Sequence, residues 1–376
     1  MMLEDLESKI EKNVALNEFT TMGVGGNASF FVRIKKEEDI PLYVNWASKQ
    51  GLPLLILGCG SNMIISDLGF KGLVLKIEIS GYTQFHEDDN QVHVTVGAGV
   101  IWDDFVEYSV KRGWWGIENM SLIPGTVGAL AVQNVGSYGQ EAKNVVSSVR
   151  VYNLYTKEFH DLSNEECKFR FRRSIFNTTE ASHYIITATR FRLLKGYHPV
   201  LTRKEIRNNL IKHNDPCFQT QIRKLVIKLR TSGRLLPKPN TYGNSGTFFQ
   251  ASLIPYKELG KIIYNLIANK KISLVVKILA CILKHSSSEG VIIPARFFIK
   301  EYGLINLSFG SVKLYESSCV VLVTVDKNAQ AYNIIKMAEK ICGTVFEKSG
   351  IIIPIEPVLT GFTAEELIPI SLFCEK

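Results

Sequence analysis

Two glycine-rich segments contain the residues best suited to hold a large anionic ligand. The first is the loop Gly58, Cys59, Gly60, Ser61 and Asn62, which follows a short apolar run at 54–57. Glycine permits positive φ and a close backbone approach, and successive N–H groups in such a loop can form a nest for an anion. A tight structural turn would explain the same residues. The spacing is not the GxGxxG fingerprint, so a Rossmann domain is not supported.

The second segment, residues 123–139, is apolar and rich in glycine. This composition indicates backbone that passes close to a large flat ligand, whose polar edge Gln133 and Asn134 would bond and beside which Tyr138 would stack. A series of stacked turns is the alternative explanation. The residues that we expect to contact the ligand are Pro124, Gly125, Thr126, Gly128, Gln133, Asn134, Gly136 and Tyr138.

Three further side chains have types that suit reaction chemistry. Arg172 lies in the basic run 169–176, Thr247 in the glycine-rich stretch 243–249, and Glu356 directly after the apolar run 351–355. Taken singly, the arginine fits a solvated basic run and the threonine fits an ordinary turn. The glutamate is harder to explain, because a carboxylate beside an apolar run is costly to bury without a role.

Composition and charge limit the class of protein. The chain has 376 residues, of which 46% are hydrophobic and 21% charged, as in ordinary globular proteins. No apolar run reaches the roughly 18 residues of a membrane span, and the first five residues do not resemble a secretory signal. Seven scattered cysteines without a CxxC pair indicate reduced thiols and no zinc site. We therefore expect a cytoplasmic protein with no metal ion, no membrane partner and, by default, a monomeric state.

The positive charge favours an anionic small molecule as the ligand. With 44 Lys and Arg against 36 Asp and Glu, the net charge is +8. No motif that reads nucleic acid accompanies it, so a phosphorylated ligand is the better interpretation.

Periodicity predicts a mixed α and β chain in which strands lead into these loops. We expect strands at 30–34, 54–57, 91–96, 145–154, 184–194 and 319–325. We expect helices at 37–49, 102–111, 205–213, 221–230 and 329–348, and the region 255–283 is rich in helix formers.

The order of these motifs along the chain resembles the UDP-N-acetylenolpyruvoylglucosamine reductase family. The resemblance covers about residues 14–362 and includes further matches at 116–119 and 167–176. The stretch 199–202 is similar to the longer, type I form of that family.

The resemblance implies an α+β chain with three domains. Residues 1–78 and 79–200 would be the two FAD-binding subdomains of the PCMH, or vanillyl-alcohol-oxidase, type. Residues 201–356 would be an α/β substrate-binding domain, and residues 357–376 would pack back on the first subdomain. NADPH would reduce FAD, and the flavin would deliver hydride to UDP-N-acetylglucosamine enolpyruvate, giving UDP-N-acetylmuramate for peptidoglycan synthesis.

The resemblance also implies roles for the three reactive side chains. Arg172 would bind the substrate carboxylate, where an arginine suits the developing negative charge. Thr247 would donate the proton, with Ser245 as a weaker alternative, and Glu356 would support the enolic intermediate. The residues implied in substrate binding are Arg203, Arg234, Asn244, Ser245 and Gly246.

Several positions depart from the family pattern, mainly on the substrate side. Phe171 replaces a tyrosine, Thr247 a serine, Arg203 a tyrosine and Leu235 a lysine. Ala251 replaces an asparagine, Pro357 replaces a valine, and the segment 261–288 is longer and more apolar than in the family. Two alternatives therefore remain open: a PCMH-fold FAD oxidoreductase acting on another substrate, and a non-catalytic binding protein derived from the fold.

Overall fold

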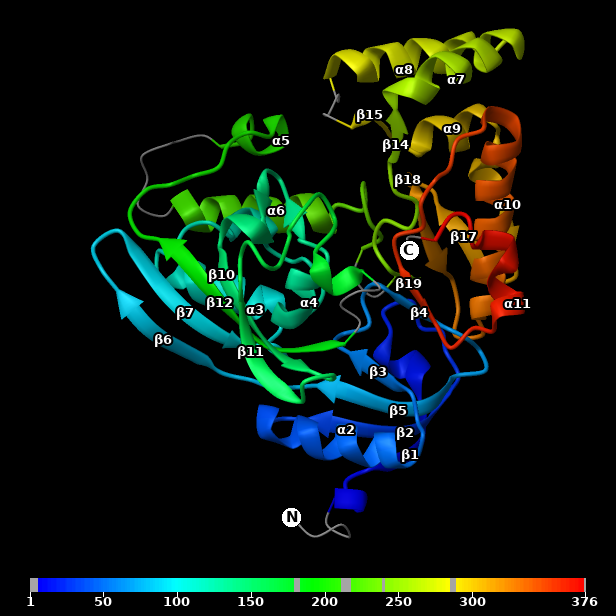
Figure 1. Ribbon diagram of the computed structural model, residues 1–376. Helices are drawn as coiled ribbons and strands as arrows, with labels where there is room; N and C mark the ends of the chain where they lie inside the picture. Colours follow the sequence, from blue (N-terminus) through cyan, green and yellow to red (C-terminus); the bar gives the residue numbers. More distant parts are fainter. Residues whose placement is uncertain (1–5, 179–182, 211–217, 239–240, 285–288, 375–376) are drawn as a thin grey trace. The chain divides into compact units, whose positions relative to one another are not determined.

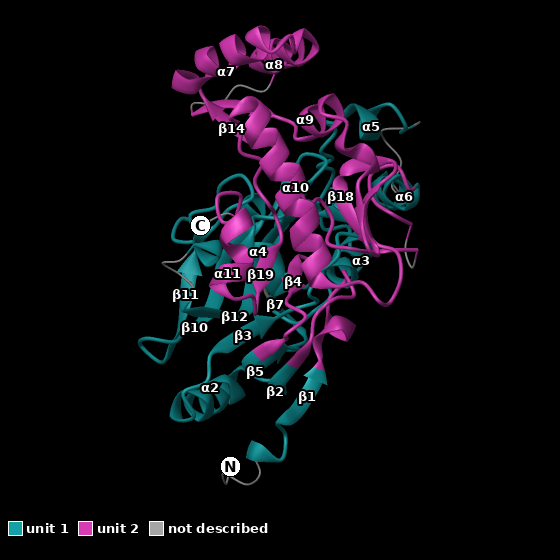
Figure 2. Cartoon of the chain, turned by 90° about the vertical axis from the view of Figure 1, so that its right-hand side faces the viewer, with its two compact units in different colours: residues 1–14, 28–60, 71–232 teal, residues 15–27, 61–70, 233–376 magenta. Residues whose placement is uncertain are grey.

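A computed structural model describes residues 6–178, 183–210, 218–238, 241–284 and 289–374. The part described divides into two compact units (Figure 2). Unit 1 comprises residues 1–14, 28–60 and 71–232, and unit 2 comprises residues 15–27, 61–70 and 233–376. The bounds of these two units differ from those of the three domains expected from the sequence. The bounds of the three domains stay a prediction.

Unit 1 begins with a four-stranded sheet in the order β1-β2-β5-β3, formed by Glu11–Ala15, Asn27–Ile34, Phe70–Ile77 and Leu54–Leu57. Strands β3 and β5 run parallel. Helix α2 (Ile40–Lys49), which follows the short 3-10 turn η2 (Glu37–Asp39), buries Tyr43, Trp46 and their apolar neighbours. Its Trp46 ring meets Phe30 of β2 edge-on at 5.2 Å. The helix thus fixes the sheet whose strand β3 leads into the loop 58–62.

A five-stranded antiparallel sheet forms the second layer of unit 1, in the order β11-β10-β12-β7-β6 (Figure 1). Its strands are Glu158–Ser163, Val146–Asn153, Tyr184–Leu194, Gln91–Gly97 and Tyr82–Glu87. Helix α3 (Trp102–Lys111) packs Phe105 against Phe191 of β12, with ring centroids 4.8 Å apart. The alternation of Val92, Val94 and Val96 as buried residues confirms the period of two predicted for this strand.

The remaining elements of unit 1 are short except for α6, and two of them, α4 and β8, lie within the glycine-rich segment 123–139. They are η3 (Glu118–Met120), α4 (Val127–Val132), β8 (Gly136–Ser137), β9 (Gln140–Glu141), η4 (Ala142–Asn144), η5 (Ile175–Asn177), α5 (Lys204–Arg207) and α6 (Phe218–Thr231). The helix predicted at 205–213 ends early within the described residues, and its last three positions lie outside them. Helix α6 buries Phe218, Ile222 and Val226 against Trp115.

Unit 2 contains a four-stranded sheet in the order β13-β18-β17-β16, formed by Gly243–Asn244, Ser318–Thr324, Val312–Tyr315 and Ser308–Phe309. Helix α10 (Ala331–Ser349) packs its apolar side into the same core, with Ile334, Ala338 and Ile341 fully buried. The helix ends at Gly350, whose φ of 70° is the left-handed conformation that commonly terminates helices.

The other elements of unit 2 pack around this sheet or pair with each other. They are η1 (Leu16–Phe19), β4 (Met63–Ile65), β14 (Ser252–Pro255), α7 (Tyr256–Ala268), α8 (Ile272–Lys284), β15 (Gly290–Ile293), α9 (Arg296–Glu301), η7 (Leu304–Asn306), β19 (Val358–Thr360), α11 (Ala364–Leu367) and η8 (Ile368–Ile370). Strand β19 pairs parallel with β4, and β14 pairs antiparallel with β15. No helix within the described ranges is long and apolar enough to cross a membrane.

Candidate active site

The loop that follows β3 is held close to the start of α4. A Cβ atom on Gly58 would come 3.2 Å from Thr126 Oγ1, so this loop position leaves little room for a side chain. Gly60 has a φ of 58°, and the Lys76 ammonium donates a hydrogen bond to the Gly58 carbonyl (2.7 Å). Burial raises the pKa of the Cys59 thiol, although the charge of Lys76 opposes this effect. Cys59 is therefore a neutral thiol in this loop.

The turn 124–126 is fixed by backbone hydrogen bonds on both sides. Trp102 N–H donates to the Gly125 carbonyl (3.0 Å), and the first helical N–H groups, of Val127 and Gly128, donate to Val100 and Ala98 (both 2.9 Å). A Cβ on Gly128 would lie 2.8 Å from the Cβ of Ala98, so only glycine fits this approach. The Thr126 hydroxyl accepts from Ala129 N–H as the helix cap. These N–H groups are therefore used within the protein, and of residues 124–126 only Pro124 is exposed.

Asn134, predicted to contact the ligand, has its side-chain amide bonded within the protein. Its Nδ2 donates to Glu141 (3.1 Å) and to the Arg170 carbonyl (2.8 Å), and its Oδ1 accepts from Lys143 N–H (2.9 Å). The residue is 2% exposed and has a φ of 43°. The Asn134 side chain therefore ties this loop to the segment that carries Arg172. Gln133, its neighbour at the end of α4, is half-buried.

Arg172 lies in a tight turn that projects from this anchored segment. The backbone N–H groups of Arg170 and Arg173 donate to each other's carbonyls (2.8 and 3.1 Å), which leaves Phe171 and Arg172 as the two central residues. Arg172 has a φ of 56°, a conformation that costs a non-glycine residue energy and is often found at functional sites. Its guanidinium lies 5.8 Å from the ring of Phe171, which is 66% exposed. The ring that replaces the family's tyrosine thus lies beside the arginine.

Arg230, at the end of α6, is a charged residue that the sequence analysis did not single out. Its Nη2 donates to the Ser137 hydroxyl (2.7 Å), and its guanidinium lies 5.9 Å from the Tyr138 ring. Its Nε is buried and has no acceptor within the described residues. Burial, and to a lesser degree the charge of Arg172, lowers the pKa of Arg230, while Tyr138 and Asp103 oppose the shift. The contact joins residues about ninety positions apart, so no local pattern in the sequence could reveal it.

A buried polar network supports the backbone at Tyr138. The fully buried Glu118 carboxylate accepts from Gly116 N–H (2.9 Å) and from the Gln140 amide (2.7 Å). Gln140 in turn accepts from Asn119 N–H (2.7 Å). The Asn119 amide donates to the carbonyls of Tyr138 (3.0 Å) and Val200 (2.8 Å). The stretch 116–119 therefore positions Tyr138 and the chain leading to Arg203.

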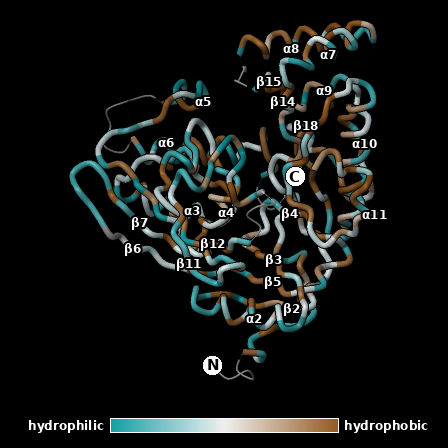
Figure 3. The backbone as a smooth tube through the Cα atoms, viewed as in Figure 1, coloured by the Kyte–Doolittle hydropathy of each residue, from teal (hydrophilic) through white to brown (hydrophobic). Residues whose placement is uncertain are grey.

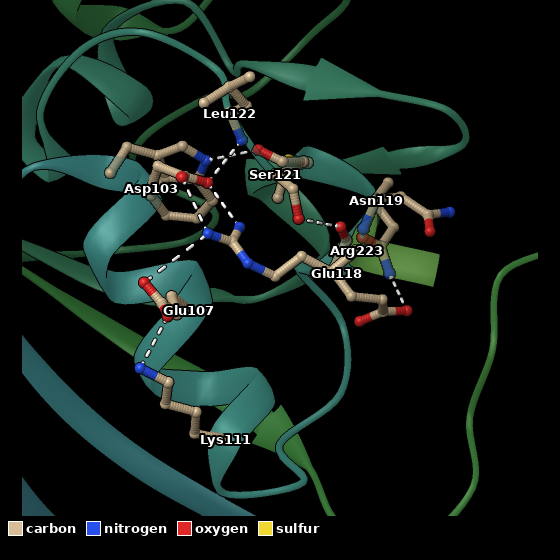
Figure 4. Close-up of polar contacts among 11 residues, drawn as sticks. Asp103, Glu107, Lys111, Glu118, Asn119, Ser121, Leu122 and Arg223 are labelled. Carbon is tan, nitrogen blue, oxygen red and sulfur yellow. Dashed lines mark hydrogen bonds and ion pairs between the residues drawn. The ribbon is translucent and has the colours of Figure 1, made fainter. Parts of the chain in front are cut away.

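A bidentate ion pair connects α3 to α6 beside this network (Figure 4). Arg223 donates to both oxygens of Asp103 (2.6 and 2.9 Å), and Asp103 also accepts from Leu122 N–H (2.5 Å). Burial alone would raise the pKa of Asp103, but the hydrogen bonds from Arg223 and Leu122 lower it overall. Leu122, with a φ of 57°, directly precedes the segment 123–128. The pair therefore anchors the start of that segment.

In unit 2, the structure brings Thr247 and Glu356 to neighbouring backbone positions. Glu356 N–H donates to the carbonyl of Phe248 (3.0 Å), the residue after Thr247, and Gln250 N–H donates to the Pro354 carbonyl (2.9 Å). Both phenylalanines after Thr247 are buried, and Phe248 N–H is bonded to Val320 (2.8 Å). Thr247 itself is exposed and Glu356 is half-buried. Thr247 and Glu356 thus stand beside the buried Phe248 and Phe249, with their backbones joined by hydrogen bonds.

Pro357, a departure from the family pattern, fits this arrangement without loss of a bond. Proline has no backbone N–H to donate, and the hydrogen bonds here come from its two neighbours. Glu356 N–H donates to the Phe248 carbonyl, and Val358 N–H donates to the Asn62 carbonyl (3.0 Å). The Asn62 amide also donates to the Glu356 carbonyl (3.4 Å). The loop residue Asn62 therefore adjoins Glu356 within unit 2.

The predicted substrate residues comprise three adjacent residues, 244–246, and two separate arginines. Asn244 is anchored to Thr21, whose hydroxyl donates to the Asn244 carbonyl (2.7 Å), and the Asn244 side chain accepts from Gly246 N–H (3.1 Å). Ser245 is 6% exposed, and its hydroxyl has no hydrogen-bond partner in the described part of the chain. Arg203 in unit 1 and Arg234 in unit 2 are exposed, as is Leu235.

The described residues contain no group of three or more His, Cys, Asp or Glu side chains placed to hold a metal ion. Their six cysteines are all free, and Cys217 lies outside the described part.

Comparison with known proteins assigns the class first. The family described as "FAD binding domain" matches residues 28–158. A crystal structure of UDP-N-acetylenolpyruvylglucosamine reductase from Thermus caldophilus has a similar fold, with a TM-score of 0.60 at 19% identity. That similarity covers 93% of this chain and 98% of the other. The chain thus has the fold of an FAD-binding protein with an α+β architecture, as predicted.

Relatives in sequence define the family. The UDP-N-acetylenolpyruvoylglucosamine reductase of Bdellovibrio bacteriovorus is 32% identical over 356 residues, covering 93% of this chain and 99% of that protein. The protein of the same name from Alcanivorax borkumensis is 34% identical over 314 residues, covering 82% and 84%. This chain belongs to the family of UDP-N-acetylenolpyruvoylglucosamine reductases.

Proposed function

We propose that this chain catalyses the reaction of its family and that Arg172, Thr247 and Glu356 act on the substrate. The reaction is the NADPH-dependent reduction of UDP-N-acetylglucosamine enolpyruvate to UDP-N-acetylmuramate. The observation that carries the proposal is the alignment of nearly the whole chain with reductases of that name. Because the alignment covers 93% of the chain and not only the FAD-binding part, it disfavours a PCMH-fold oxidase acting on another substrate.

The residues of unit 1 fit an FAD cofactor. Gly58 leaves room for Thr126, so the two glycine-rich segments lie close together, and the match to an FAD binding domain covers both of them. Arg230 adds a buried positive charge beside Tyr138. FAD, when bound, supplies the redox chemistry between NADPH and the substrate. The contacts that we propose for it are those of the loop 58–62 and of the segment 124–138, with the Asn134 side chain acting through the loop that it anchors.

Arg172 binds the substrate carboxylate. Charge develops on that group during reduction, and a guanidinium stabilises it with two parallel hydrogen bonds. The turn supports this role because it holds Arg172 in a strained conformation, next to a segment that Asn134 ties to the glycine-rich loop.

Thr247 donates a proton to the substrate carbon, and Glu356 supports the enolic intermediate. Their backbones are joined through Phe248, which supports joint action on one group. Ser245 is the less suitable donor, because its hydroxyl is buried whereas that of Thr247 is on an exposed residue. Asn244, Gly246, Arg203 and Arg234 bind the rest of the UDP-linked sugar, the two arginines by pairing with its diphosphate. The enzyme works as a monomer in the cytoplasm and binds no nucleic acid.

Product analysis tests this function directly. The purified flavoprotein is incubated with NADPH and UDP-N-acetylglucosamine enolpyruvate, and the products are identified by mass spectrometry. We expect UDP-N-acetylmuramate in an amount equal to the NADPH consumed. NADPH oxidation without this product would contradict the proposed substrate. A protein that binds FAD but does not oxidise NADPH at all would favour the non-catalytic alternative.

A further inference from the structure

Helices α7 and α8 form a hairpin with an apolar stripe on its outer side. Figures 1 and 2 show the two helices side by side. On α8, four aliphatic residues are exposed at a spacing of four, three and four positions: Ile272 (54%), Val276 (60%), Leu279 (47%) and Leu283 (86%). On an α-helix this spacing places all four along a single face. Figure 3 shows this helix largely in the colour of hydrophobic residues.

The exposed stripe is separate from the face by which the hairpin packs against the rest of unit 2. Leu274, Val275, Ile278 and Cys281 are the buried residues of α8, and they lie on the other side of the helix. Helix α7 repeats the pattern: Leu259, Ile262 and Leu266 are buried, whereas Tyr264 is 73% and Ile267 49% exposed. Each helix thus has one apolar face in the core and a second one outside it. Folding accounts for only the first.

The hairpin that carries this stripe is rich in lysine and almost without acidic residues. Residues 256–284 contain six lysines and one glutamate, a net charge of +5. Lys271 and Lys277 pair with Glu301 at 3.8 and 3.6 Å. The other four form no ion pair with an acidic residue in the described part of the chain: Lys257, Lys261, Lys270 and Lys284.

We propose that the α7–α8 hairpin binds the surface of a membrane that contains anionic lipids. A helix with an apolar stripe and lysines at its flanks lies in the interface of such a membrane, with the apolar side chains among the acyl chains and the ammonium groups at the headgroups. The exposed Tyr264 suits the same interface, because its ring is apolar and its hydroxyl remains among polar groups.

The positive charge of the hairpin favours a membrane surface over a second copy of the chain as the partner of the stripe. Two copies that met through the stripe would bring two sets of lysines together, and like charges across an interface oppose association. A lipid surface of opposite charge attracts the same lysines. The proposal replaces our expectation of no membrane partner with contact at the surface only, and it does not depend on the catalytic function.

Vesicle binding tests the proposal with the FAD-loaded full chain. Sedimentation with vesicles of phosphatidylcholine, with and without phosphatidylglycerol, measures how the protein partitions. We expect binding only to the vesicles with phosphatidylglycerol, and we expect high salt to weaken it, because salt screens the attraction.

Two sets of variants separate the apolar and the charged contributions. Exchanging Val276 and Leu283 for serine should weaken binding about tenfold or more, since these side chains would no longer be buried among acyl chains. The triple variant Lys257→Glu, Lys261→Glu and Lys284→Glu should weaken it about a hundredfold or more, at about fivefold per basic residue. Its matched control, Lys36→Glu with Lys49→Glu and Lys327→Glu, has the same net charge. Leu68→Ser, at an exposed leucine outside the hairpin, is a single-residue control for the serine exchanges.

Both controls should bind as the wild type does, and all variants should retain FAD and NADPH oxidation. Equal binding to both vesicle types, no binding to either, or hairpin variants that bind like the wild type would each overturn the proposal. So would a dimer in sedimentation velocity that the serine variant abolishes without changing vesicle binding, because the stripe would then be a contact between copies.

Discussion

Arg172 has an unfavourable backbone conformation at the position for which we propose a catalytic role. Its φ of 56° falls at the third position of a four-residue turn, where glycine is ordinarily preferred. The arginine at this position suggests that its guanidinium matters more than the strain of the turn.

Exchanging Arg172 for glycine should therefore separate stability from activity. We expect Arg172→Gly to unfold within about 1 kcal/mol of the wild type in urea, since glycine relieves a strain of about that size. Its kcat/KM for the enolpyruvyl substrate should fall at least a hundredfold. Lys157→Gly, at an exposed turn residue with a φ of 58°, is the matched control and should leave activity unchanged. Full activity in Arg172→Gly would remove the arginine from the mechanism.

Thr247 and Ser245 are the two candidate proton donors, and the two assignments lead to opposite predictions. Thr247→Val should lower kcat by roughly a hundredfold or more, the contribution of a positioned proton donor, while Thr247→Ser retains activity. Ser245→Ala should have little effect on kcat, because the hydroxyl that it removes is buried without a partner among the described residues. Steady-state kinetics of the three variants decide the matter. The reverse ranking would make Ser245 the donor.

At the scale of elements, the site depends on contacts between segments far apart in the sequence. The Asp103–Arg223 pair joins α3 to α6 and fixes Leu122, and it is well shielded, with side chains 21% and 11% exposed. Neither residue touches the glycine-rich turn itself, so the pair is a positioning device for it.

Asp103→Asn should destabilise the protein by about 2 kcal/mol, since it leaves a largely buried arginine without its charge partner. Because the start of the glycine-rich segment loosens, FAD should also dissociate more readily. Urea unfolding and flavin release, followed by fluorescence, measure the two effects. Glu107→Gln is the control: Glu107 is 4.0 Å from Arg223 and 47% exposed, so stability should change by no more than about 0.5 kcal/mol. Equal effects of both variants would refute the special role of the pair.

Glu118 should give the stability of the protein a distinct pH dependence. Burial raises its pKa above the ordinary value of 4.5, although hydrogen bonds from Gly116 N–H and the Gln140 amide oppose this. Above pH 4.5 the folded state holds a proton that the unfolded state has lost. The free energy of unfolding therefore falls as pH rises from 4.5 through the pKa of the folded state.

Glu118→Gln removes this ionisation, so its stability relative to the wild type should improve as pH rises over the same range. Urea unfolding of both proteins between pH 4.5 and 8 measures the difference. A difference that stays constant with pH would contradict a raised pKa. Asp103 acts with the opposite sign, since its pKa is lowered from 3.8 and its stabilising effect is lost only as pH falls through that lowered value.

At the scale of the whole molecule, the elements with strong periodicity were predictable from the sequence. Helix α3 and strand β12 have the predicted bounds, and the bounds of α10 are within two residues of the prediction. The region 255–283 was predicted only as rich in helix formers. The structure divides this region into two helices, which are separated by residues 269–271. Lys270 has a φ of 58° there, a conformation usually taken by glycine, so the sequence did not mark this turn.

The site was predictable where it depends on local motifs and not where it depends on packing. The glycine-rich loops and the three proposed reactive side chains stand in short local motifs, so the sequence alone could suggest them, and their roles stay a prediction. Arg230, Glu118 and the Asp103–Arg223 pair become significant only when segments some twenty to over a hundred residues apart meet. The two faces of α8 are likewise both apolar, and only burial in the fold distinguishes them.

The most direct test of the central claim separates the two halves of the reaction under anaerobic conditions. NADPH is added first, and UDP-N-acetylglucosamine enolpyruvate second, while the visible absorbance of the flavin is recorded in a stopped-flow instrument. We predict that NADPH bleaches the flavin in both the wild type and Arg172→Ala. The substrate should then restore the colour rapidly in the wild type but at least a hundredfold more slowly in the variant. A wild-type flavin that bleaches and is not recoloured by this substrate would contradict the account.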